Sequence, residues 1–308
     1  MAKLITTLGD FQLEDLGGGP ILPHEHVFVD MRGADHPDLG VADADAVVAL
    51  MAPELARARA VGVACVVVCT PVGVGRRADV ELAVSRAADL PLVVPTGIYR
   101  EPWIPRWAHE ASEADLAAWM QAELEVGIGR TGVRAAWIKL SAGDDGVTRA
   151  EVKVLRAAAA ASLATGATIG SHTIRGRVAL DQLTVAAKVG FSPDHFIWIH
   201  AHNETDLGLH SEMAARGVWL EYDAIGSSDE SDNVILSLVQ RALANGYGNQ
   251  VLLSQDRGWY DPAKPGGGTP RSFAHLVTTF LPRLRESGVS NRQIDQLTRL
   301  NPFRAFSR

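Results

Sequence analysis

The sequence is poor in cysteine and lacks both an excess of basic charge and any long apolar run. Its 308 residues include 36 acidic and 29 basic side chains, so a net charge of -7 offers no basic surface to nucleic acid or an anionic membrane. No stretch approaches the roughly 18 apolar residues that span a bilayer, and the first residues lack the apolar segment of a secretory signal. We therefore expect a cytoplasmic protein that acts on a small-molecule substrate and binds neither nucleic acid nor membrane.

The two cysteines, Cys65 and Cys69, lie in one apolar run over residues 64–70. On a strand, residues four apart share a face but stand about 13 Å apart, too far for a disulfide or for chelating one metal ion. The spacing predicts buried, reduced thiols.

Apolar content is high: 47% of the residues are hydrophobic, which is enough for a sizeable core. The sequence shows no linker, internal repeat or low-complexity tract. Because α/β barrels commonly occupy this length as one unit, we expect a single domain over residues 1–308.

Eight short apolar runs alternate with segments rich in Ala, Leu, Glu and Arg, which predicts parallel βα units. The predicted strands cover 20–24, 64–70, 91–97, 135–140, 167–172, 196–200, 218–222 and 250–256. The predicted helices cover 43–61, 78–89, 112–128, 149–165, 176–190, 205–216, 231–246 and 271–287. We predict an α/β fold, a (β/α)8 TIM barrel with a short N-terminal β extension over 1–19 that closes the barrel floor. The Pro- and Gly-rich stretch 262–270 follows the last strand and is interpreted as an active-site loop.

Metal-binding side chains gather at the predicted strand ends, which in a barrel of this type converge on one mouth. His24 and His26 are two apart, so both point to one side of the first strand while Glu25 points away. The other candidates are Lys139, His172, His200 and Asp256. A lone histidine at a strand end is more often structural than a ligand. Together, however, these groups would cost a few kcal/mol each if left unpartnered in an apolar barrel, so the set predicts a metal site.

Several motifs in this order resemble one known family. They are Leu-Pro-His-Glu-His at 22–26, Thr-Gly-Ile-Tyr at 96–99, Ile-Lys at 138–139, Gly-Ser-His-Thr at 170–173, Ile-His at 199–200 and Leu-Ser-Gln-Asp at 253–256. The sequence resembles the phosphotriesterase family of the amidohydrolase superfamily, which includes phosphotriesterases, lactonases and related esterases. The resemblance spans nearly the whole chain.

The resemblance implies a centre with two divalent metal ions. Zinc is favoured, with cobalt, manganese and iron as alternatives. The implied ligands are His24, His26 and Asp256 on the more buried ion, His172 and His200 on the more exposed ion, and Lys139 bridging both as N6-carboxylysine. A free ammonium group repels a cation, so a bridging lysine requires that carbon dioxide has converted its amine to a carbamate.

Two of these assignments have alternatives. Lys139 could instead form an ion pair with a nearby carboxylate. His202 is a rival to His200, because matching the following Thr205-Asp206 pair to the family pattern requires a shift of one residue. We prefer His200, which continues the apolar strand directly.

Such a centre predicts hydrolysis by a metal-bridging hydroxide, with the metal ions about 3.5–4 Å apart. By resemblance, Asp256 would act as general base and then acid, and Tyr99 would lie near the exposed metal ion and the leaving oxygen. No Gly-x-Ser-x-Gly nucleophile motif is present.

Substrate contacts are predicted from the loop after the last strand, where Arg257, Trp259, Tyr260 and Lys264 follow Asp256. The cations and the tyrosine suit a phosphorylated or carboxylated lactone. The segment 221–226 lacks the arginine expected in the acyl-homoserine lactonase branch, which disfavours that substrate.

We therefore predict a hydrolase of a lactone or carboxylic ester, with phosphotriester hydrolysis as the alternative. Two further hypotheses are a non-catalytic ligand-binding barrel derived from such enzymes and a mononuclear deaminase on the same scaffold. A homodimer is compatible with the family resemblance.

Overall fold

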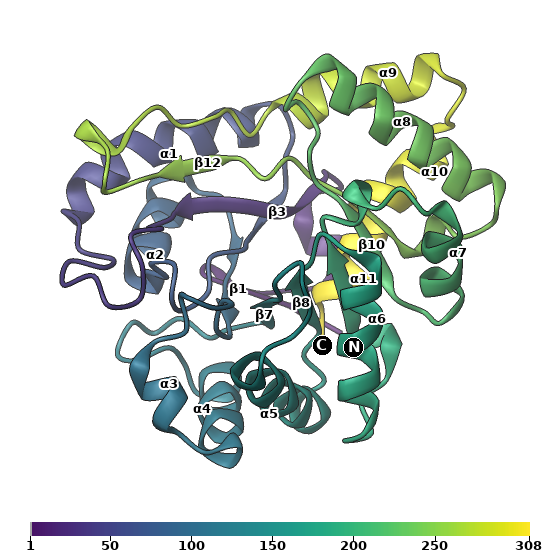
Figure 1. Cartoon of the computed structure of the whole chain (residues 1–308). Coiled ribbons are helices and arrows are strands. Elements are labelled where there is room, and N and C mark those ends of the chain that lie inside the picture. The colour runs from purple at the N-terminus through teal and green to yellow at the C-terminus, as the bar shows by residue number, and fades with distance from the viewer. Residues whose placement is uncertain (1) are drawn as a thin grey trace.

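A parallel β-barrel forms the centre of the computed structural model, which describes residues 2–308 (Figure 1). Its strands are β3 (Ile21–Phe28), β4 (Cys65–Val68), β5 (Leu92–Val93), β6 (Pro95–Thr96), β7 (Trp137–Ser141), β8 (Ile169–His172), β9 (Phe196–Ile199), β10 (Trp219–Tyr222), β11 (Val251–Leu253) and β12 (Gly258–Tyr260). They pair in the orders β12-β3-β4-β5 and β11-β10-β9-β8-β7-β6. The pieces β5 and β6 together correspond to the third predicted strand. The predicted (β/α)8 barrel is confirmed.

The barrel closes where β3 lies beside β11. There the Asp256 amide donates to the His24 carbonyl oxygen at 3.1 Å, and the Ser254 hydroxyl accepts from the His24 amide at 2.9 Å. Two residues of the predicted metal site therefore also form the seam between the first and last barrel strands.

Helices surround the strands on all sides in Figure 1. They are α1 (Ala44–Ala60), α2 (Ala78–Ala88), α3 (Arg106–Glu110), α4 (Glu113–Glu125), α5 (Arg149–Thr165), α6 (Gly176–Ala187), α7 (Leu207–Ala215), α8 (Asp229–Ala244), α9 (Leu281–Glu286), α10 (Asn291–Asp295) and α11 (Asn301–Phe306). Three of them begin with capping boxes, in which Ser112 pairs with Asp115, Thr148 with Glu151 and Ser290 with Gln293. No helix within residues 2–308 is both long and apolar enough to cross a membrane.

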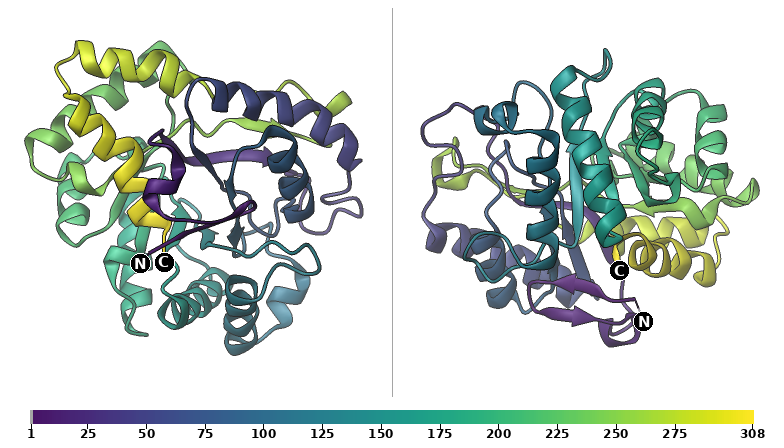
Figure 2. Two further views of the ribbon diagram at one scale, coloured as in Figure 1. Left: turned by 180° about the vertical axis from the view of Figure 1, so that it is seen from behind. Right: turned by 90° about the horizontal axis from the view of Figure 1, so that it is seen from below.

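The predicted N-terminal extension is an antiparallel hairpin of β1 (Leu4–Thr6) and β2 (Gly9–Phe11), followed by the 3-10 helix η1 (Leu13–Leu16). Leu4, Ile5 and Leu16 belong to the apolar cluster that fills the lower barrel interior. The two chain ends lie together in Figure 2, where Lys3 and Arg308 exchange backbone hydrogen bonds of 2.9 and 3.0 Å. The hairpin and the C-terminus therefore close the barrel floor.

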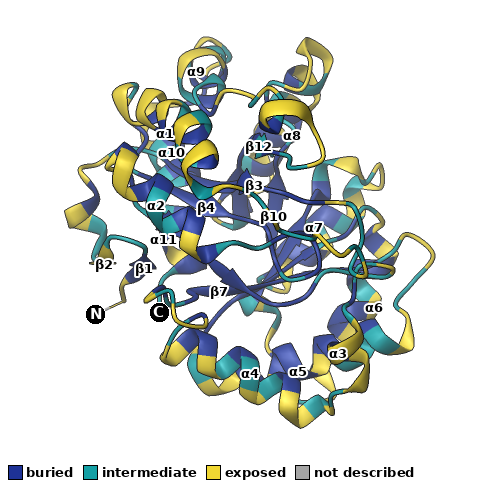
Figure 3. Ribbon diagram, turned by 90° about the vertical axis from the view of Figure 1, so that its left-hand side faces the viewer, coloured by how far each residue is buried: buried dark blue, intermediate teal, exposed yellow. Residues whose placement is uncertain are grey.

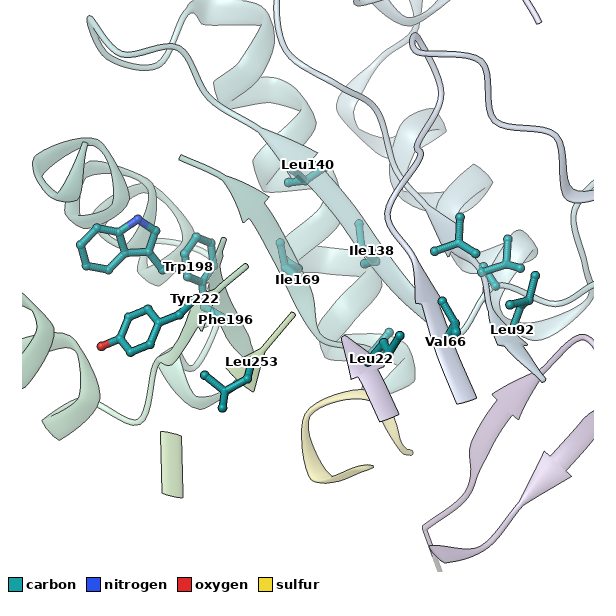
Figure 4. Close-up of a cluster of buried hydrophobic side chains, with 14 of the residues drawn as sticks. Leu22, Val66, Leu92, Ile138, Leu140, Ile169, Phe196, Trp198, Tyr222 and Leu253 are labelled. Atoms are coloured by element: carbon teal, nitrogen blue, oxygen red, sulfur yellow. The ribbon is translucent and has the colours of Figure 1, made fainter. Parts of the chain in front are cut away.

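In β4, β7 and β9, alternate residues enter two separate apolar clusters. The outer cluster lies between strands and helices and includes Val66, Ile138 and Trp198 (Figure 4). The inner cluster includes Cys65 and Val67, and both cysteines are buried and free, as predicted. Figure 3 shows the consequence, with buried strands inside helices whose outer faces are exposed.

The inward-facing rows of β7 and β10 change from apolar to polar along the strand. Trp137 near the floor is followed two residues later by Lys139, and Trp219 is followed by Glu221 and then Asp223. Because residues two apart share a face, each polar side chain lies one or two steps above an apolar one. The apolar lower barrel thus holds the polar groups at the mouth.

The C-terminal quarter differs from prediction. The last strand β11 ends at Leu253, and an unpredicted strand β12 pairs with β3. The helix predicted over 271–287 begins later, as the π-helix η6 (Leu276–Phe280), because Arg271 pairs with the Gly258 backbone. The helices α10, η7 (Gln296–Leu300) and α11 were not predicted, nor was α3. Three more 3-10 turns precede or follow barrel strands, namely η2 (Pro193–His195), η3 (Ala201–Asn203) and η4 (Gly248–Gln250), and η5 (Pro265–Gly267) lies in the loop after β12.

Glu81 on α2 offers a test of the helix layer. It is fully buried, and within residues 2–308 neither carboxylate oxygen has a hydrogen-bond partner. Burial raises the pKa of Glu81 to about 8, from an ordinary value of 4.5. The folded protein therefore keeps a proton that the unfolded chain loses as the pH rises from 4.5 to 8, and stability falls over that window by about 1 kcal/mol per pH unit.

We expect Glu81→Gln to remove this slope, so the variant gains on the wild type as the pH rises. Urea unfolding at pH 5, 6, 7 and 8 measures the difference. Glu286→Gln, an exposed position on α9, is the control and should show no pH-dependent difference. A constant offset between Glu81→Gln and the wild type would contradict the burial argument.

Candidate metal centre

The six predicted metal ligands meet at the barrel mouth. They line one cavity of about 80 Å³, together with Tyr99 and Trp259. The remaining wall is largely apolar and consists of Val29, Met31, Cys69, Pro71 and Val74. Strands and strand ends far apart in the sequence thus bring together the residues that the sequence predicted to be neighbours.

His24 and His26 both face Asp256 from β3. Their Nε2 atoms lie 3.7 and 3.2 Å from Asp256 Oδ1, and both histidines are nearly fully buried. Glu25 points the other way, where it accepts hydrogen bonds from Ser254 and the Arg257 amide. The expected alternation along the strand is confirmed.

His172 and His200 form the opposite wall. His200 Nε2 lies 2.8 Å from His172 Nδ1, and the Tyr99 hydroxyl lies 3.4 Å from the same His172 atom. His202 does not face the main cavity. It lines a second cavity, with its Nδ1 3.4 Å from Asp223.

Three imidazoles form hydrogen bonds through Nδ1, on the side of the ring away from the cavity. Glu221 Oε1 lies 2.6 Å from His24 Nδ1, Asp223 Oδ1 lies 2.7 Å from His200 Nδ1, and the Thr70 hydroxyl lies 2.7 Å from His26 Nδ1. Each contact fixes the ring and leaves Nε2 to face the cavity, the arrangement that metal-binding histidines require.

Glu221 and Asp223 were missed as functional residues by the sequence reasoning. Both are completely buried and belong to the inward-facing row of β10 and its end. The available signal was their spacing of two residues at a predicted strand end, the same spacing that identified His24 and His26.

Lys139 is almost fully buried and lines the cavity. Among residues 2–308, no carboxylate lies within ion-pair distance of its Nζ, which instead lies 6.0 Å from the Trp137 ring centroid. The alternative of a lysine ion pair therefore finds no partner in the described chain. The Lys139 amine is thus buried beside the predicted metal ligands without an anionic partner. Conversion of this amine to a carbamate would place a negative charge there instead.

Burial favours the neutral form of three of these imidazoles. Burial, assisted by Lys139, lowers the pKa of His24 to about 3, and burial also lowers the pKa of His26 and His172. Burial alone would raise the pKa of Asp256, but His26 and His24 outweigh it and hold that pKa below the usual range. Neutral imidazoles and an ionised carboxylate are the protonation states that bind a divalent cation.

An unpaired carboxylate oxygen is a second reason to regard these residues as a candidate metal centre. Asp256 Oδ1 is buried, and the described residues provide it with no hydrogen bond. One donor atom each from His24, His200 and Asp256 lie within 4.8 Å of one another. An unpaired carboxylate oxygen among imidazole nitrogens is costly unless a cation is bound there.

Backbone strain is concentrated at this centre. Four non-glycine residues of the described chain have positive φ, and three of them are His200 (67°), Asp256 (50°) and Trp259 (78°). Such conformations cost about 1–3 kcal/mol each and cluster at functional sites. The surrounding hydrogen bonds therefore hold these side chains against a local preference to relax.

The predicted substrate contacts divide into two groups. Trp259 lines the cavity and lies 5.2 Å from His26 between ring centroids. Arg257 donates instead to the Gly226 carbonyl, Tyr260 stacks on Phe28, and the Lys264 side chain is 63% exposed beside Asp261. The loop over 262–270 contributes to neither cavity wall at the mouth.

Comparison with known proteins identifies relatives along the whole chain. The model of the phosphotriesterase family matches residues 2–306. A phosphotriesterase homology protein of Mycobacterium tuberculosis is 31% identical over 326 residues, covering 100% of this chain and 98% of the relative. An aryldialkylphosphatase of Saccharolobus solfataricus is 26% identical, covering 98% and 99% of the two chains. A phospho-furanose lactonase of Mycoplasmopsis synoviae is 25% identical, covering 98% and 91%.

Solved structures of similar proteins also superpose on nearly the whole chain. A triple mutant of the organophosphorus hydrolase from Deinococcus radiodurans superposes with a TM-score of 0.85 at 30% identity, covering 98% of this chain and 97% of the other. A second structure, of a weak promiscuous lactonase engineered for organophosphate hydrolysis, gives a TM-score of 0.86 at 30% identity over 99% of both chains.

The Glu221–His24 contact generates a prediction. Glu221→Ala removes the acceptor that orients the His24 ring, so we expect metal affinity to fall about 10- to 100-fold. Glu221→Gln keeps a carbonyl oxygen at that place and should retain most of the affinity. Competition with a chelator measures affinity, and thermal unfolding of the metal-free proteins separates this effect from a loss of folding. Equal affinities for the alanine variant and the wild type would show that Glu221 does not position His24.

Proposed function

The chain belongs to the phosphotriesterase family, and we propose that it uses two divalent metal ions to cleave a lactone or carboxylic ester. Its relatives include an aryldialkylphosphatase and a phospho-furanose lactonase, so the chain is a metal-dependent enzyme that hydrolyses ester bonds. We propose zinc as the metal, with cobalt, manganese or iron as alternatives, and a small molecule as the substrate.

The observation that carries the proposal is the unpaired Asp256 Oδ1 beside four neutral or anchored imidazoles at one cavity. We propose His24, His26 and Asp256 as ligands of the more buried ion and His172 and His200 as ligands of the other. Lys139 as N6-carboxylysine would bridge them, with carbon dioxide joined to its amine nitrogen and one amine proton released. His200 is preferred to His202 because its Nε2 faces His172.

When bound, the two ions lower the pKa of water and polarise the scissile carbonyl. Asp256 is the proposed general base that accepts the proton of the attacking water and later delivers it to the leaving oxygen. Its low pKa keeps it ionised before the reaction. Tyr99, with its hydroxyl toward His172, would orient the leaving oxygen by a hydrogen bond.

Ester hydrolysis at carbon is preferred over phosphotriester hydrolysis on the chemistry of the cavity. The apolar wall and the donor groups of Tyr99 and Trp259 suit a compact ring or acyl chain with one oxygen to be bound. Phosphotriester hydrolysis is the second candidate, because relatives of both kinds are present. A phosphorylated or otherwise anionic lactone is included in the first candidate.

The carbamate assignment predicts a linked loss. In Lys139→Ala we expect metal content and activity to disappear together, with activity falling at least about a thousandfold, because the metal pair supplies several kcal/mol to the reaction. Lys139→Arg, which keeps a cation but forms no stable carbamate, should behave alike. Lys188→Ala, at an exposed lysine after α6, is the matched control. Metal analysis and a carbon NMR signal from labelled bicarbonate are the measurements, and retention of metal and activity in Lys139→Ala would refute the bridge.

The substrate class predicts an order of activities. On zinc- or cobalt-loaded protein we expect lactones to give the highest kcat/KM, then aryl esters, then phosphotriesters. Release of acid or chromophore measures each rate, and Asp256→Asn supplies the background. Inactivity on every lactone, with turnover of phosphotriesters, would replace the first candidate by the second.

A further inference from the structure

A second cavity, of about 270 Å³, opens beside the first at the barrel mouth. The two share His172, His200 and Asp256, so any substrate held over these residues reaches into both. Unlike the first, the second cavity has a largely polar wall, which also includes His202, Asn203, Asp223, Ser227 and Arg271. We call it the polar cavity.

Arg271 is the guanidinium group of the polar cavity, and the fold holds it in place. Its backbone exchanges hydrogen bonds of 3.0 and 3.2 Å with Gly258 at the start of β12. Its Nη2 donates to the Asp256 carbonyl oxygen at 2.6 Å, and its guanidinium lies 5.5 Å from the Trp259 ring centroid. A stacked and tethered guanidinium loses little freedom on binding a ligand.

The charge of Arg271 is not neutralised by the protein. Within residues 2–308, Arg271 forms no ion pair with a carboxylate, although Lys264 pairs with Asp261 and Arg283 with Asp232. A guanidinium that lines a cavity, is held in place by the backbone and has no carboxylate partner favours binding of an anion.

We propose that Arg271 binds an anionic group of the substrate, a carboxylate or a phosphate, while the ester carbonyl lies against His172, His200 and Asp256. Asn203 and Ser227 supply further hydrogen bonds within the polar cavity, and the first cavity binds the uncharged part of the substrate. Arg271 thereby replaces Arg257 and Lys264 as the anion contact expected from the sequence. This inference rests on the proposed ester hydrolysis and names the substrate class of that site.

Three matched substrates test the assignment on zinc-loaded protein. They are γ-butyrolactone, the same ring with a carboxylate on the γ carbon, and the same ring with a phosphorylated hydroxymethyl group on the γ carbon. For Arg271→Gln we expect kcat/KM to fall about 10- to 100-fold on a charged lactone, mainly through KM, because a charge-assisted hydrogen bond is lost. The value for γ-butyrolactone should stay within about threefold of the wild type. Arg271→Lys should restore part of the loss.

The matched control is Arg304→Gln. Arg304 also lies over a tryptophan, 5.4 Å from the Trp219 ring centroid, but it lines a groove formed by the N-terminal segment and α11. All three substrates should be unaffected by this change. Dependence on Arg271 for one charged lactone alone identifies the anion as carboxylate or phosphate, and either result supports the assignment. Equal losses on charged and uncharged lactones would overturn it, since Arg271 would then act only through the Asp256 backbone. No loss on any lactone would also overturn it.

A binding measurement keeps this inference separate from the proposed function. If the wild type hydrolyses none of the lactones, the proposed function fails, whereas the anion site is still tested by calorimetry with inorganic phosphate and with acetate. We expect Arg271→Gln to weaken binding of at least one of them about 10-fold or more relative to wild type and Arg304→Gln. Unchanged affinity for both anions would overturn the anion site whatever the catalytic result.

Discussion

Hydrogen bonds in which Glu221 and Asp223 accept from the imidazoles of His24 and His200 are the interactions on which the mouth of this barrel depends. Glu221 and Asp223 reach the backs of His24 and His200 and leave Nε2 of each ring turned to the cavity. Burial raises the pKa of Glu221, whereas His200 holds the pKa of Asp223 low despite burial, so burial disfavours ionisation of the first carboxyl and the imidazole favours ionisation of the second. That arrangement balances charge within an interior where an unmatched ion is costly.

The same interior accounts for the division between the two ends of the barrel. Tryptophan, cysteine, valine and isoleucine fill the floor, and the N-terminal hairpin covers them. This apolar floor leaves the polar groups at the mouth as the open end of the barrel. The strained backbone at His200, Asp256 and Trp259 lies at that open end.

Strand ends and their polar side chains could be predicted from the sequence because both follow from local alternation. Local patterns were enough to identify four of the predicted ligands without tertiary information. They are the pair His24 and His26, and Lys139 and His172 at the ends of apolar runs. By contrast, β12 depends on pairing with β3 across the whole chain, and the position of Arg271 depends on Gly258. Sequence proximity to Asp256 favoured Arg257 as an anion contact, yet its side chain turns to the Gly226 carbonyl. Non-local pairing decided these positions.

The seam between β3 and β11 joins two parts of the site that are synthesised at different times. The first strand carries two imidazoles of the site, and the carboxylate that faces them lies more than two hundred residues later, at Asp256. A ribosome releases the histidines long before it makes their partner. Under the proposed assignment, the set of metal ligands therefore becomes complete only after the segment that follows β11 has been made and the barrel has closed.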